Sequence, residues 1–229
     1  METQTAQAEK NIFHREWLFW MILLLPFIYI IFIWNKLPNS IPTHWNIKGE
    51  VDNYSSRTAG TLFLPLLNIG LYLLLLLLPK IDPRKKNYQH FGNTYRNIRL
   101  LLTLFMTTMF FVTMQIALGA MAMDTKAVLI LILGLIAALG NFMRTIRSNF
   151  FVGIRTPWTL DNPEVWRKTH ETGGRLWFYA SLLGIVILLF TGKAFIAWFA
   201  ILYLGAIIIY PILYSYLLFR KINKIKNEV

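Results

Sequence analysis

The chain has 229 residues, of which 56% are hydrophobic and only 15% are charged, with 23 Lys and Arg against 11 Asp and Glu. A soluble domain usually carries about 25% charged residues, so this composition argues against a soluble globule and against a disordered chain. The chain has no Cys, which excludes a disulfide scaffold and a zinc ribbon.

The apolar residues gather in six long blocks, at 17–34, 61–78, 100–123, 127–143, 176–190 and 194–219. A bilayer core of about 30 Å needs roughly 20 apolar residues when the chain crosses it as an α-helix. The sequence therefore predicts an all-α integral membrane protein with six transmembrane helices, and a lipid bilayer as its main partner.

The cations are distributed unevenly among the segments that connect these blocks. The N-terminus, the 79–99 and 144–175 segments and the C-terminus together hold 18 Lys and Arg, and the other segments hold five. Because cytoplasmic loops are enriched in Lys and Arg, this asymmetry predicts that both termini lie in the cytoplasm. The cations flank the apolar blocks, where lipid headgroups lie, so the positive charge does not indicate direct binding of nucleic acid.

The resulting organisation has a membrane unit on either side of a basic loop. We expect a cytoplasmic N-terminus at 1–16, a two-helix unit at 17–79 with an external loop at 35–60, a basic cytoplasmic loop at 80–99, a four-helix unit at 100–219 with a cytoplasmic loop at 144–175, and a basic tail at 220–229. The basic loop suits lipid headgroups, or alternatively an acidic partner. The fifth block is short, so its helix is expected to begin near Gly173, with Gly173 and Gly174 as a joint.

The predicted spans carry mild polar residues and no ionisable residue at mid-depth, which argues against a proton-coupled pump. Asn68, Thr103 and Thr107 predict hydrogen bonds between helices, with a substrate path as the alternative. Gly134 with Ala138, and Ala180 with Gly184, have the spacing of closely packed helices.

Nothing in the sequence indicates catalysis. It contains no nucleophile beside a base, no phosphate-binding glycine loop and no set of metal ligands. We therefore expect a protein that is not an enzyme and that needs no cofactor.

The external loop is the first of two polar segments that could carry a function. Pro38 and Pro42 favour extended chain there, and the residues from Asn46 to Gly49 predict a turn. The segment is either a packed cap on the helices or a recognition surface. The candidate recognition residues are Pro42, His44, Trp45, Asn46 and Gly49.

The second segment lies in the cytoplasmic 144–175 loop. Asp161 or Asn162 is a suitable N-cap for a helix that starts at Pro163 and places Trp166 and His170 on one face. The segment is either a connector held by its own hydrogen bonds or a docking and switching site. Its candidate residues are Asn149, Gly153, Arg155, Thr156, Pro157, Trp158, Thr159, Trp166, Thr169 and His170.

These two segments carry a resemblance to known proteins. Residues 149–160 and 165–170 resemble the signature of the SdpI family, and 41–46 with Gly49 resembles an N-terminal domain often fused to it, which has no assigned biochemistry. The resemblance implies a bacterial immunity protein against a secreted, sporulation-delaying toxin. It also implies a receptor that draws a cytoplasmic autorepressor to the membrane when the toxin is present.

The leading hypothesis is therefore a multi-pass immunity protein of the bacterial cell membrane, with a secreted peptide toxin outside and a repressor protein inside as partners. The alternatives are a small transporter or permease and an accessory subunit of a larger membrane complex. The transporter would use the polar face of the third block, including Thr107 and Gln115.

Overall fold

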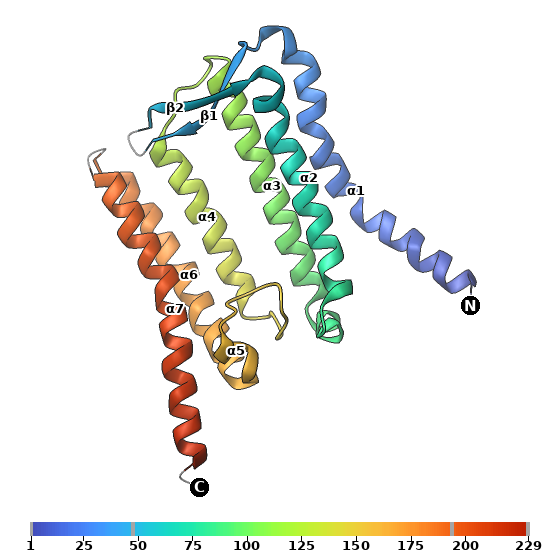
Figure 1. The fold of residues 1–229 in the computed structure, drawn as a ribbon, viewed down its shortest axis with the longest axis vertical. Coiled ribbons are helices and arrows are strands. Elements are labelled where there is room, and N and C mark those ends of the chain that lie inside the picture. The colour runs from blue at the N-terminus through green and yellow to red at the C-terminus, as the bar shows by residue number, and fades with distance from the viewer. Residues whose placement is uncertain (1, 47–48, 193–194, 228–229) are drawn as a thin grey trace. The chain divides into compact units, whose positions relative to one another are not determined.

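The computed structural model describes residues 2–46, 49–192 and 195–227, and its six long helices are the feature that defines the protein (Figure 1). They are α1 Glu2–Ile33, α2 Arg57–Ile81, α3 Gly92–Ala117, α4 Thr125–Met143, α6 Pro163–Phe190 and α7 Ile196–Asn227. Each is long and apolar enough to cross a membrane, so the six predicted spans are confirmed. The protein is a multi-pass membrane protein.

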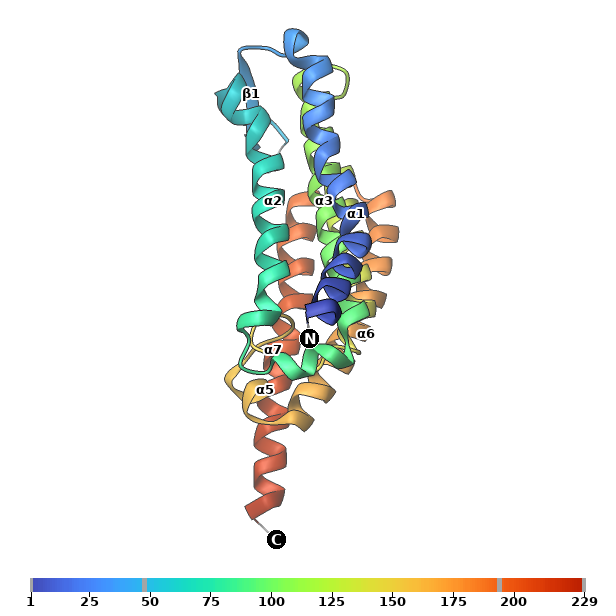
Figure 2. The same cartoon turned by 90° about the vertical axis from the view of Figure 1, so that its right-hand side faces the viewer.

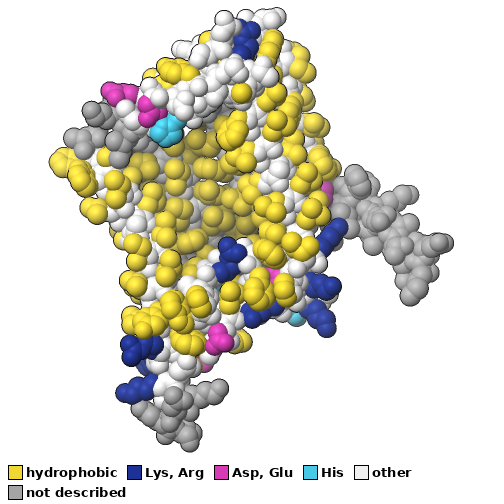
Figure 3. Space-filling view, viewed as in Figure 1, with side chains coloured by type: hydrophobic (Ala, Val, Ile, Leu, Met, Phe, Trp, Pro, Cys, Tyr) yellow, Lys and Arg dark blue, Asp and Glu magenta, His cyan; other side chains and the backbone are white. Residues whose placement is uncertain are grey.

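The outer surfaces of these helices are suited to lipid. At most 33% of the most apolar window of each helix is buried inside the protein. Figure 3 shows hydrophobic side chains spread over the helices. Exposing so large an apolar surface to water would cost free energy, so this surface is suited to contact with the acyl chains of lipids.

A β-hairpin stands where the sequence suggested an irregular external loop. Strands β1 Ser40–Trp45 and β2 Val51–Ser56 pair antiparallel, with Ser40 opposite Ser56 (Figure 1). Figure 2 shows β1 beside the start of α2. The all-α prediction is therefore correct for the spans and incomplete for the 35–60 segment. Register shifts follow Pro42, which has no N–H to give to a ladder.

The helix α6 corrects the prediction for the fifth span. It runs without interruption from Pro163 to Phe190, so Gly173 and Gly174 lie inside a helix and form no joint. Their role is close packing: a Cβ on Gly174 would stand 2.7 Å from the carbonyl oxygen of Gly140 in α4. The sequence could not distinguish a hinge from a helix contact, because both use glycine.

The contacts divide the chain into two compact units, the first comprising residues 1–74 and 100–123 and the second residues 75–99 and 124–229. The sequence grouped the third span with the later spans, whereas the structure packs most of α3 with α1 and α2. Asn68 Nδ2 donates to the carbonyl of Thr103 and to Thr107 Oγ1, each at 3.1 Å, and Gln115 Nε2 donates to the Tyr29 hydroxyl at 3.0 Å. The predicted hydrogen bonds between helices are thus present.

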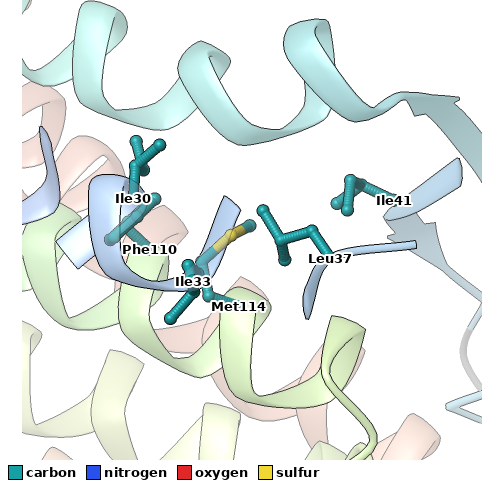
Figure 4. Close-up of a cluster of buried hydrophobic side chains, with 6 residues drawn as sticks. All are labelled: Ile30, Ile33, Leu37, Ile41, Phe110 and Met114. Atoms are coloured by element: carbon teal, nitrogen blue, oxygen red, sulfur yellow. The ribbon is translucent and has the colours of Figure 1, made fainter. Parts of the chain in front are cut away.

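A buried apolar cluster joins the hairpin to the helices of the first unit (Figure 4). It consists of Ile30, Ile33, Leu37, Ile41, Phe110 and Met114. Gly60 lets α2 approach β1, since a Cβ there would stand 2.6 Å from that of Ile41. The hairpin is therefore anchored to the helices, as expected for a packed cap.

In the second unit α4, α6 and α7 pack together through small residues and buried polar bonds. A Cβ on Gly184 would stand 2.8 Å from the Tyr203 ring, as its predicted packing role requires, whereas Gly134 has open space around it. Trp177 Nε1 donates to the carbonyl of Ile207 at 2.9 Å and so ties α6 to α7. Two shorter elements complete the unit, the 3₁₀ helix η2 Lys85–His90 and α5 Pro157–Asp161.

Candidate functional site

The connector, residues 144–162, joins α4 to α6 and is folded around the side chain of Asn149. This side chain is fully buried. Its Oδ1 accepts from the backbone N–H groups of Phe151 and Val152 at 2.9 and 2.7 Å, and its Nδ2 donates to the carbonyls of Arg147 and Val152. One amide thus satisfies four backbone groups, which makes Asn149 the centre of the turn.

The buried His170 holds the middle of the connector against α6. The N–H of Ile154 donates to His170 Nε2 at 3.0 Å, so Nδ1 carries the proton and donates to the Trp166 carbonyl at 2.8 Å. The rings of Trp166 and His170 stack at 4.1 Å, which confirms that they share a face. Gly153 has a φ of +113°, and a Cβ there would overlap Nε2 of His170.

The start of α5 is closed by a reciprocal cap. Thr156 Oγ1 accepts from the N–H of Thr159, and Thr159 Oγ1 accepts from the N–H of Thr156. Pro157 occupies the first turn, where its missing N–H is harmless. Two contacts join this segment to α7. The hydroxyl oxygens of Thr156 and Ser215 lie 3.1 Å apart, and the ring centroids of Trp158 and Tyr216 lie 5.0 Å apart.

The two remaining candidates of this segment differ in exposure. Arg155 is exposed and donates to the carbonyl of Phe150 at 2.7 Å. Thr169 is fully buried, and its hydroxyl has no hydrogen-bond partner among the described residues. The predicted N-cap is Asn162, whose Oδ1 accepts from the N–H groups of Glu164 and Val165.

Asp82 is the most important contact of the connector that sequence reasoning missed. Its buried carboxylate accepts from the N–H of Phe150 at 3.0 Å, the hydroxyl of Tyr88 at 3.0 Å and the N–H of Arg84 at 2.7 Å. Burial, followed by the hydrogen bond to Asp82, raises the pKa of Tyr88, which keeps its hydroxyl a donor. Asp82 is the only acid in 79–99, and this is the signal that the sequence offered.

Two further residues of the same loop bind the connector and were also missed. Arg84 donates to the hydroxyl of Ser148 and to the carbonyl of Leu160, and Asn87 donates to the carbonyl of Ser148 at 2.7 Å. The loop that appeared to be only basic is thus part of the folded site.

At the hairpin, the predicted turn from Asn46 to Gly49 has its centre, residues 47 and 48, outside the described residues, whereas its two ends are described. The N–H of Gly49 donates to the carbonyl of Asn46 at 2.9 Å, and Gly49 has a φ of +83°. Asn46 Nδ2 also donates to the carboxylate of Glu50 at 2.8 Å, and Asn46 Oδ1 accepts from the backbone N–H of Glu50 at 3.1 Å. His44 is exposed and lies 2.5 Å from the carboxylate of Asp52, which suits a surface pair.

Trp45 borders a cavity of about 440 Å³ between the hairpin, α2 and α3. Its Nε1 is buried and has no hydrogen-bond partner among the described residues, while Pro42 is buried in β1. The other walls include Phe63, Met106 and Met109. The walls of this cavity are mostly apolar, which suits an apolar group of a ligand.

The described residues contain no group of three His, Cys, Asp or Glu that could hold a metal ion. Both segments instead present hydrogen-bonded turns with exposed edges, an arrangement that suits recognition of a partner.

Both the connector and the hairpin lie in regions that are similar to known protein families. Residues 145–215 match the SdpI/YfhL protein family, and residues 21–69 match a domain of unknown function, DUF1648. The chain is also similar to the immunity protein SdpI of Bacillus subtilis (strain 168), with 27% identity over 206 residues, which cover 89% of this chain and 95% of that protein. No solved structure matches the chain.

The SdpI/YfhL range contains the connector from residue 145 onward and Ser215 of α7, which contacts it, and the DUF1648 range contains the hairpin. The protein is therefore a multi-pass membrane protein in which a region similar to the SdpI/YfhL family follows a region similar to DUF1648.

Proposed function

We propose that this protein is an immunity protein that protects a bacterium from a secreted peptide toxin. The observation that carries the proposal is the similarity to the immunity protein SdpI, which extends along nearly the whole of both chains. The proposed protection acts through binding, for which the two polar segments offer surfaces.

The hairpin is the proposed toxin site. The positive-inside rule places it outside the cell, where a secreted toxin arrives. An apolar toxin side chain would fill the cavity beside Trp45. Burial of an apolar side chain is worth about 1.5–3 kcal/mol.

The connector is the proposed cytoplasmic partner site. Three spans separate it from the hairpin along the chain, which puts the two segments on opposite sides of the bilayer. The exposed Arg155 and the half-buried Trp158 offer a charge and an aromatic face to a soluble repressor. Toxin binding would have to favour one of two states of the protein to change this surface.

Expression in a bacterium that is sensitive to the sporulation-delaying toxin tests the proposal. The wild-type protein should raise the toxin concentration needed to kill half the cells. Trp45→Ala removes an aromatic wall of the cavity, so protection should fall about fivefold or more, the equivalent of about 1 kcal/mol of lost binding. Tyr54→Ala removes an exposed ring of the same hairpin that does not line the cavity, and it should have no effect.

Killing that is unchanged by the wild-type protein at good membrane expression would reject the immunity role. Equal protection by the wild type and by Trp45→Ala would show that the toxin does not bind at the cavity. Arg155→Ala separates the two segments, since it should preserve protection while it weakens recruitment of a tagged repressor to the membrane.

A further inference from the structure

The second unit contains a cavity of about 520 Å³ that the proposed function does not use. Its walls come from the η2 loop (residues 84–90), both ends of the connector and the start of α6, and all of these belong to the same unit. The stacked rings of Trp166 and His170 are part of its lining.

The lining of this cavity is rich in arginine. Arg84, Arg144, Arg147 and Arg167 contribute to it, against the two carboxylates of Asp161 and Glu164. The walls are thus positively charged on balance, which attracts an anion.

Two of these arginines are already engaged with the protein. Arg84 binds Ser148 and Leu160 and lies over the ring of Phe150 at 4.9 Å, and Arg167 pairs with Glu171 at 3.0 Å. One carboxylate is engaged as well, since Glu164 pairs with Lys168 at 2.7 Å.

Arg144 and Arg147 are not engaged. Among the residues whose side chains the structure describes (16–46, 49–192 and 195–225), neither guanidinium has a hydrogen-bond or ion-pair partner. They stand three residues apart on the segment that leaves α4, next to the turn that Asn149 fixes. The backbone of Arg144 and Arg147 is therefore held in place, while the N–H donors of both guanidinium groups are available to a ligand.

The start of α6 does not compete for an anion. The Asn162 side chain already accepts from the N–H groups of Glu164 and Val165, so these N–H groups are satisfied. Recognition of an anion at this cavity would come from the guanidinium groups, which bind phosphate oxygens through two parallel N–H donors.

We propose that this cavity binds a phosphate group through Arg144 and Arg147. The phosphate belongs either to the headgroup of an anionic phospholipid or to a free phosphate compound. Both sources present the same oxygens, and the volume of the cavity leaves room for the group that the phosphate carries. Bound phosphate would bridge the end of α4 to the η2 loop and stabilise the connector.

Binding to the purified full-length protein in a neutral detergent tests this proposal with two probes. The first is radiolabelled inorganic phosphate at equilibrium, and the second is phosphatidylglycerol retained by the protein in native mass spectrometry. The test variant is Arg144→Gln/Arg147→Gln. The matched control is Lys85→Gln/Lys86→Gln, which removes two exposed charges of the same loop region that do not line the cavity.

The arginine variant should bind at least one of the two probes about tenfold or more weakly than the wild type does. The lysine variant should bind both probes like the wild type. Loss confined to the retained lipid identifies a headgroup as the ligand, and loss confined to labelled phosphate identifies a free compound. Thermal unfolding without either probe checks that the variant is folded. If it is not, Arg147→Lys keeps the charge without the planar fork and should still weaken binding several-fold.

Equal binding of both probes by all three proteins would overturn the proposal. So would an equal loss in the lysine variant, because it would show that only the general positive charge attracts phosphate.

Discussion

Gly153 is the residue at which the backbone of the connector and its buried histidine depend most directly on each other. Its φ of +113° is unfavourable for any residue with a Cβ, and Nε2 of His170 occupies the place where that Cβ would stand. The same nitrogen accepts from Ile154, so moving the ring would break a buried hydrogen bond.

Gly153→Ala should therefore lower the free energy of unfolding by about 2–4 kcal/mol, the combined cost of backbone strain and overpacking. Thermal unfolding of the purified protein in detergent measures this. Gly70→Ala is the control, since a Cβ on Gly70 meets nothing within 4 Å and its backbone is helical. A Gly153→Ala variant as stable as the control would contradict this description of the connector.

The sequence identified the residues of the connector better than it identified their contacts. Asn162 could be predicted as a cap, and Trp166 and His170 as neighbours, because caps and helix faces depend on residues within four positions. The bond between Asp82 and Phe150 joins residues that are 68 positions apart, so no local pattern reports it. As the only acid in 79–99, Asp82 stands out in the sequence, but nothing near it identifies Phe150 as its partner.

At the scale of elements too, features that depend on neighbouring residues could be predicted from the sequence, and features that depend on contacts between distant residues could not. The six spans follow from apolar length alone, and the structure confirms them. The hairpin requires β1 to meet β2 and to pack on Phe110 and Met114, which lie more than fifty residues further along the chain. The length of α6 was underestimated because its first turns are polar, so hydropathy detects only its apolar part.

The contact of α4 with α6 gives a prediction at this scale. Gly140 and Gly174 face each other so closely that a Cβ on either would stand under 3.0 Å from backbone atoms of the other helix. Backbone cannot rotate away, so Gly174→Ala should push the helices apart and lower the free energy of unfolding by about 1–3 kcal/mol.

Thermal unfolding in detergent measures this effect too, with Gly134→Ala as the control. Gly134 also lies in α4 but has open space, and alanine favours helix over glycine there. The prediction fails if the two variants unfold at the same temperature.

At the scale of the whole molecule, charge and hydropathy answer different questions. Hydropathy determines how many times the chain crosses the bilayer, whereas the division of 18 cations from five predicts which ends of the helices face the cytoplasm. The proposed division of labour, with a toxin at the hairpin and a repressor at the connector, depends on this orientation. The orientation is therefore the property of the whole protein that most needs a direct measurement.

The absence of Cys from the sequence makes this measurement simple, since each introduced Cys is then the only thiol. Asn53→Cys in the hairpin and Lys86→Cys in η2 both replace exposed residues. A thiol reagent that does not cross membranes should label Asn53→Cys in intact cells, and Lys86→Cys only after the cells are opened. Labelling of Lys86→Cys alone in intact cells would reverse the orientation. Equal labelling of both would contradict an odd number of crossings between them and remove the basis for placing a toxin and a repressor on opposite sides.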